Sequence, residues 1–158
     1  MRITRGLQLR KGPIAGAMMT LLLVTSCAES QRLQPFTTDG CSLFPDGSLI
    51  SKSDWCSCCL AHDLSYWQGG SEEERLNADR ALRSCVRHAS GDEKLADLMF
   101  VGVRAGGGPY FFTPYRWGYG WPFGRRYEPL SSSEQAQVMP LRAKYVSSNP
   151  TLSCPSGP

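Results

Sequence analysis

The sequence predicts a small, mainly α-helical domain that is exported and cross-linked by disulfide bonds. The first 26 residues have the composition of an export signal. Seven cysteines in a chain of 158 residues indicate a disulfide framework once the chain has left the cytoplasm. Helix start and stop signals follow one another from residue 54 to residue 109.

The expected signal peptide spans residues 1–26. Its apolar run, 12–24, is too short to cross a bilayer comfortably. Before it stand four basic residues, Arg2, Arg5, Arg10 and Lys11. The run ends in Val24-Thr25-Ser26-Cys27, which resembles the lipobox of bacterial lipoproteins and would make Cys27 the lipidated first residue of the mature chain. An ordinary cleavage site close to Cys27 is the alternative.

A membrane anchor at Cys27 would leave residues 27–37 as a polar tether to the domain. Ala28 follows Cys27 in place of an aspartate, which by analogy with bacterial lipoproteins favours the outer over the inner membrane of the cell envelope. Without the basic residues of the signal peptide, 13 basic residues stand against 14 acidic ones. This near-neutral balance offers no clustered basic face for nucleic-acid binding.

The domain itself is expected at residues 38–146. Its first segment, Thr38 to Leu49, is rich in glycine, aspartate, serine and proline, which indicates an ordered loop. A helix over residues 54–68 follows, with Ser51 or Ser53 as its cap and Gly69-Gly70 as its end.

Three further helices follow from local signals. Ser71 begins the first with a capping box that includes Glu74, and this helix should run to about Ala89, before Gly91. The second covers residues 92–103 and ends before the glycines at 106–108. Residues 131–146 form a short last helix, and 147–158 a flexible tail.

Residues 110–127 hold nine aromatic side chains spaced by glycine and proline, so this segment cannot be a regular helix. Two interpretations stay open. The aromatic residues form a surface that sits at a bilayer interface, or they form a second small core wrapped over the helices. We favour the second interpretation, because exposed apolar patches of that size are unusual.

One face of the helix at 54–68 carries chemically active side chains where a plain core helix would place leucine or valine. Cys58, His62 and Tyr66 are spaced four residues apart and therefore stack on that face. Cys59 and Asp63 form a second row beside them.

The next helix carries a related anomaly, because Asp79 lies within an apolar stripe formed by Leu76, Leu82 and Val86. A carboxylate is seldom buried without a partner. Gly69-Gly70 makes a tight connection, so the two helices should run antiparallel and bring His62 and Asp79 to a similar height. An imidazole held by a buried carboxylate is the usual arrangement of a general base.

These residues form motifs that resemble the secreted phospholipase A2 superfamily, and above all its small bacterial and fungal members. Cys58-Cys59-Leu60-Ala61-His62-Asp63, with Tyr66 after it, is similar to that family's catalytic helix. Thr38-Asp39-Gly40-Cys41, followed by Pro45-Asp46, resembles its calcium loop. Asp79, with Cys85 six residues later, resembles its second catalytic helix. The resemblance covers residues 38–86.

The resemblance implies Ca²⁺-dependent hydrolysis of phospholipid acyl esters at a membrane surface. His62 would take a proton from water, Asp79 would orient His62, and Tyr66 would hydrogen-bond Asp79. The ligands implied for calcium are Asp63, Asp39 and the carbonyl group of Gly40, a set of oxygens that suits a hard cation. By the same resemblance Cys41 would pair with Cys59, and Cys58 with Cys85. Cys56 and Cys154 would then remain for a third bridge.

Other interpretations of the same residues stay open. Cys56, Cys58, Cys59 and His62 include the usual ligands of zinc, although adjacent cysteines on one helix point about 100° apart. Asp39 is either a calcium ligand or an ordinary turn residue, and Asp46 is interpreted as a turn residue. The whole domain could instead be a catalytically inactive envelope lipoprotein that acts as a lipid-binding or structural module.

Overall fold

The computed structural model describes residues 32–47 and 54–149, which form four α-helices and no strand. The helices are α1 (Cys56–Gln68), α2 (Glu72–Ser90), α3 (Glu93–Gly106) and α4 (Ser132–Ser148). The prediction of a mainly α-helical domain is therefore confirmed. The expected signal peptide, Cys27, Ala28, Ser51, Ser53, Cys154 and most of the tail lie outside the described residues.

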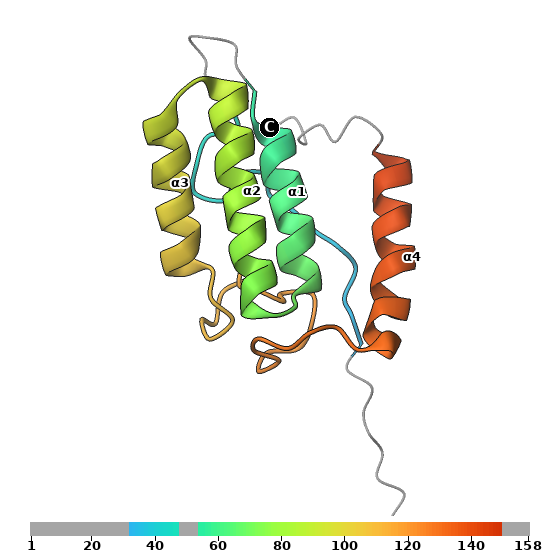
Figure 1. Ribbon diagram of the computed structural model, residues 1–158. Helices are drawn as coiled ribbons and strands as arrows, with labels where there is room; N and C mark the ends of the chain where they lie inside the picture. The colour runs from blue at the N-terminus through green and yellow to red at the C-terminus, as the bar shows by residue number, and fades with distance from the viewer. Residues whose placement is uncertain (1–31, 48–53, 150–158) are drawn as a thin grey trace, which may run out of the picture.

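Helices α1, α2 and α3 lie side by side, with α2 in the middle (Figure 1). The capping box predicted at the start of α2 is present, since Ser71 accepts a hydrogen bond from Glu74 N and the Glu74 side chain accepts from Ser71 N. Gly91 ends α2 in the left-handed conformation, with φ of 69°. Asp92 then caps α3 by accepting from Leu95 N.

Two boundaries differ from the prediction. Helix α1 begins at Cys56, and the Asp54 carboxylate accepts a hydrogen bond from Cys56 N at 2.8 Å. Helix α3 continues past Val103 to Gly106, where the N–H of Gly107 bonds to the carbonyl of Val103. One glycine within a helix costs only about 1 kcal/mol, which the tertiary contacts of the last turn outweigh.

Two disulfides join α1 to the loop that precedes it and to α2, next to the first core. Cys41–Cys59 ties the loop before α1 to that helix, and Cys58–Cys85 ties α1 to α2. These are the two pairings that the resemblance implies. Cys56 is disulfide-bonded as well. Because all three cysteines of α1 are in disulfides, they are not available as thiolate ligands for zinc.

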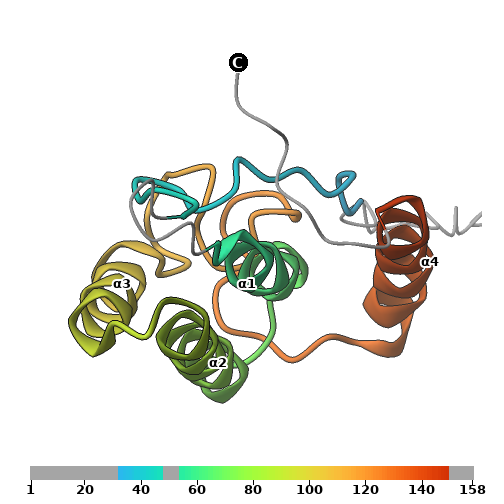
Figure 2. The same cartoon turned by 90° about the horizontal axis from the view of Figure 1, so that it is seen from above.

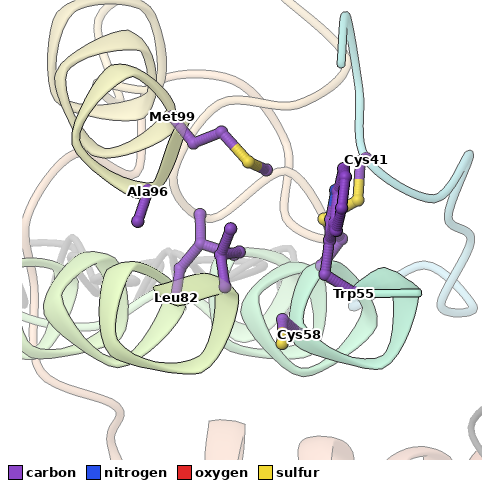
Figure 3. Packing of buried hydrophobic residues seen from close by; sticks show 8 residues of the cluster. Cys41, Trp55, Cys58, Leu82, Ala96 and Met99 are labelled. Atoms are coloured by element: carbon purple, nitrogen blue, oxygen red, sulfur yellow. A yellow bond between two sulfur atoms is a disulfide. The ribbon is translucent and has the colours of Figure 1, made fainter. Parts of the chain in front are cut away.

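The first core lies between these disulfides and α3 (Figure 3). Leu82 of α2 meets Ala96 and Met99 of α3, and Trp55 covers the start of α1. Burying a leucine or methionine side chain contributes about 1.5–3 kcal/mol. This core therefore holds α3 against the disulfide-linked pair.

A second core attaches α4, which stands apart from the other helices with irregular segments between (Figure 2). Val138 of α4 packs with Leu33, Trp67 and Trp121. The burial of Leu33 corrects the predicted extent of the tether, which was placed at residues 27–37. Apolar Leu33 and Phe36 instead extend the packed domain to the N-terminal side of residue 38.

The aromatic segment contains both buried and exposed side chains. Trp117 and Trp121 are buried, and their indole N–H groups donate to the carbonyls of Gly70 and Gln68 at the end of α1. Five large side chains of the segment are exposed, namely Tyr110, Phe111, Phe112, Tyr115 and Phe123. Within the described part of the chain, no helix is long and apolar enough to cross a membrane.

Candidate active site

The candidate site is built on the facing sides of α1 and α2. Nε2 of His62 lies 2.9 Å from Oδ1 of Asp79, in a contact buried between the two helices. Cys58 near the start of α1 is bridged to Cys85 near the end of α2, so these helices run in opposite directions (Figure 1). This arrangement carries the His62 and Asp79 side chains to the same level.

Asp79 is fully buried, and both of its oxygens are hydrogen-bonded. The Tyr66 hydroxyl donates to Oδ1 at 2.7 Å, and Nη1 of Arg104 donates to Oδ2 at 2.7 Å. Burial by itself would raise the pKa of Asp79, but hydrogen bonds from His62, Arg104 and Tyr66 lower it below its usual value. Asp79 is therefore a carboxylate within the protein interior.

His62 is the only neighbour of this carboxylate in a position to exchange a proton near neutral pH. Burial lowers the pKa of His62, but hydrogen bonds to Asp63 and Asp79 and their negative charges outweigh burial, so that the pKa is raised. Nδ1, the nitrogen that Asp79 does not engage, lies 3.9 Å from Oδ1 of Asp63. The pair of carboxylates thus stabilises the protonated imidazole.

An apolar cavity of about 150 Å³ opens beside His62. Leu43 and Phe44 of the loop form one wall, and Met99 and Val103 of α3 form another. The polar side chains on its lining include His62 and Asp63, so that an imidazole and a carboxylate face a mainly apolar space.

A neighbouring pocket is lined mainly by oxygen-bearing side chains, among them Thr38, Asp39, Ser42 and Asp63. The Thr38 hydroxyl donates to Oδ2 of Asp63 at 2.6 Å, and the Ser42 hydroxyl donates to Oδ1 of Asp39 at 2.6 Å. Carboxylate and hydroxyl oxygens of this kind are the donor class that hard cations such as calcium bind in proteins. No group of three or more acidic, histidine or cysteine side chains that could hold a metal occurs in the described ranges.

Gly40 and Asp46 form the turn next to that pocket. Asp46 Oδ1 accepts a hydrogen bond from Cys41 N at 2.8 Å, so Asp46 has the turn role assigned to it. Gly40 has φ of 81°, and a Cβ atom there would lie 2.5 Å from Asp46 Oδ1. Glycine is therefore required at this turn, and its place beside Cys41 lets Gly40 line the apolar cavity.

The sequence did not identify two arginines of the site. Arg75 is buried, and its Nε donates to the Tyr66 hydroxyl at 3.0 Å and lies 3.8 Å from Asp79 Oδ2. Its position four residues before Asp79 was a signal for this contact. Arg104 reaches Asp79 from α3, and no spacing within one helix predicts that contact.

Comparisons of the chain with protein-family models, with curated proteins and with solved structures yield no match.

Proposed function

We propose that the protein hydrolyses an acyl ester of a phospholipid, with a water molecule activated by His62 and Asp79. The observation that carries this proposal is the buried 2.9 Å contact between these two side chains beside an apolar cavity. The resemblance of residues 38–86 to secreted phospholipases A2 supports the same reaction, and within it the turn at Gly40 corresponds to a calcium loop.

In this reaction His62 accepts a proton from water at Nδ1 while the water oxygen attacks the ester carbonyl carbon. Asp79 holds the opposite ring nitrogen and stabilises the imidazolium that forms. The imidazolium then returns the proton to the leaving alkoxide as the carbon–oxygen bond breaks. Water is the nucleophile, so no acyl-enzyme forms. Tyr66 keeps Asp79 in place through its hydrogen bond to Oδ1.

Calcium would be held by Asp63, Asp39 and the Gly40 carbonyl group. Both carboxylates line one pocket with hydroxyl oxygens, which is the donor chemistry of a Ca²⁺ site. When bound, the cation would supply positive charge that stabilises the developing oxyanion. Since the two aspartates are the only acidic side chains lining the pocket, backbone carbonyls and water would complete the coordination.

The partner in this proposal is a membrane surface, reached from a lipid anchor at Cys27 in the cell envelope. Exposed aromatic side chains support it. Phe112 is 86% exposed and packs edge-on against Phe123, which is 50% exposed. On the loop, Leu43 is 89% exposed at the mouth of the apolar cavity. Apolar and aromatic side chains of this kind are favoured at the bilayer interface.

The decisive experiment measures fatty-acid release from phospholipid vesicles by the mature chain, with calcium and with a chelator. We expect release that depends on calcium and that His62→Gln lowers by a factor of about 10³ or more, because the base is lost. His88→Gln is the matched control, since His88 is an exposed residue near the end of α2. Circular dichroism should show the same helix content in all three proteins.

Two outcomes would contradict the proposal. Equal turnover by His62→Gln and the unmodified chain would exclude His62 as the base. Calcium binding in titration calorimetry without any release would favour the catalytically inactive lipid-binding module instead.

A further inference from the structure

Arg104 binds the side of Asp79 that His62 and Tyr66 do not contact. Oδ1 of Asp79 is engaged by His62 and Tyr66, both from α1, whereas Oδ2 accepts from Nη1 of Arg104 in the last turn of α3. The Asp79 side chain is completely buried and that of Arg104 is 27% exposed. The contact is therefore a charge-assisted hydrogen bond largely shielded from water, the kind that is strongest in proteins.

The last turn of α3 is itself anchored by Arg75. Its Nη2 donates to the carbonyl oxygens of Val103 and Arg104, at 2.7 and 3.0 Å. These are carbonyls at a helix C-terminus, where a cation is favoured. Arg75 thereby sets the position of the backbone from which Arg104 extends, and the same turn contributes Val103 to the wall of the apolar cavity.

We propose that Arg104 is a positioning residue for the His62–Asp79 pair. A carboxylate bonded through one oxygen can turn about its Cβ–Cγ bond, because that torsion has a broad energy profile. Arg104 fixes the second oxygen, so that Oδ1 stays directed at Nε2 of His62. The orientation of the His62 imidazole then depends on the position of α3, the helix that carries Arg104. The catalytic consequence of this role rests on the proposed function.

The test uses the full mature chain and a readout that needs no substrate. Proton NMR of histidine-labelled protein detects the Nε2–H proton of His62 when it is hydrogen-bonded to Asp79. We expect a slowly exchanging, downfield signal in the unmodified protein, and loss or displacement of that signal in Arg104→Met. Arg104→Lys, which retains one cationic donor, should restore part of it.

Arg83→Met is the matched control. Arg83 also joins α2 to α3, through an ion pair with Asp97, but the two side chains are 42% and 47% exposed and lie outside the site. In hydrolysis assays we expect Arg104→Met to lower kcat about tenfold with little change in KM, because orientation and not substrate binding is lost. Arg83→Met should change neither kcat nor the His62 signal.

An unchanged His62 signal in a folded Arg104→Met protein would overturn the proposal. If that variant does not fold, Arg104→Leu takes its place, because it is also apolar and has no hydrogen-bond donor, and the same result would count against the proposal. The two proposals fail separately. A protein that shows the Arg104-dependent signal but releases no fatty acid would refute the hydrolysis and leave the role of Arg104 intact.

Discussion

Tyr66 packs closely against the backbone just after α3. Its ring lies 4.1 Å from the His62 ring, centroid to centroid, and edge-on to Trp117 at 5.1 Å. A Cβ atom at Gly107 would lie 2.6 Å from Cε1 of Tyr66 and 2.9 Å from its hydroxyl oxygen. The absence of a side chain at Gly107 is thus what allows the hydroxyl group to reach Asp79.

Gly107→Ala should therefore displace Tyr66 and weaken its hydrogen bond to Asp79. We expect the free energy of unfolding to fall by about 1–3 kcal/mol, the usual cost of an overpacked interior, together with a loss of hydrolysis. Gly106→Ala is the control, since nothing lies within 4 Å of a Cβ atom there. Urea unfolding measures both variants. Equal stability of the two would show that Tyr66 has room to move.

Helix α4 begins at an ion pair as well as at a capping box. The Glu134 carboxylate accepts from Nε and Nη2 of Arg125, both at 3.0 Å, and also from Ser131 N at 2.8 Å. Partial burial raises the pKa of Glu134, but the bonds from Arg125 and Ser131 outweigh burial and lower it. Arg125 also lies over the Trp121 ring, which links the start of α4 to the second core.

The lowered pKa of Glu134 makes the attachment of α4 sensitive to acid. A depressed carboxyl pKa stabilises the fold above the unfolded-state value of about 4.5, and that stabilisation is lost as the pH falls through the folded-state pKa. We expect the Tm difference between the unmodified chain and Glu134→Gln to be large at pH about 6 and to shrink toward pH about 3. Glu74→Gln, at the same position of the α2 capping box, is the control. A pH-independent difference would refute this role of the ion pair.

At the scale of the whole described domain, Cys41–Cys59 and Cys58–Cys85 are two disulfides that meet on α1. Cys41–Cys59 ties the loop that carries Asp39, two residues before Cys41, to α1, and Cys58–Cys85 encloses the connection between α1 and α2. Their sequence separations are 18 and 27 residues. Loop closures of this size contribute about 3 kcal/mol each by limiting the unfolded chain. The first bridge acts on the proposed cation pocket and the second on the His62–Asp79 pair.

Removal of each bridge should have a different functional effect at a similar cost in stability. We expect Cys41→Ala/Cys59→Ala and Cys58→Ala/Cys85→Ala each to lower the free energy of unfolding by about 3 kcal/mol. Only the first should weaken calcium binding at a temperature where both variants are folded, because only that bridge holds the loop. Titration calorimetry with Ca²⁺ tests this. Equal affinity in the two variants would place the cation elsewhere.

Local patterns in the sequence were sufficient to predict the helices and to place His62 and Asp79 in the site. Capping residues mark the start of α2 and α3, because caps act on their own first turn. Spacing within helices placed His62 and Asp79 on the sides by which α1 and α2 meet. The same spacing could have identified Arg75, one helical turn before Asp79.

What the sequence by itself determined is the helical content, the capping box of α2 and the residue types that the facing sides of α1 and α2 present. The tertiary structure decided that Arg104 binds Asp79, that Leu33 belongs to the core, and that Trp117 is buried while Phe112 is exposed. The physical reason is the separation along the chain over which each kind of interaction acts. Helix periodicity and capping depend on neighbours within one turn, whereas these contacts join segments far apart in the chain and arise only once the helices have packed.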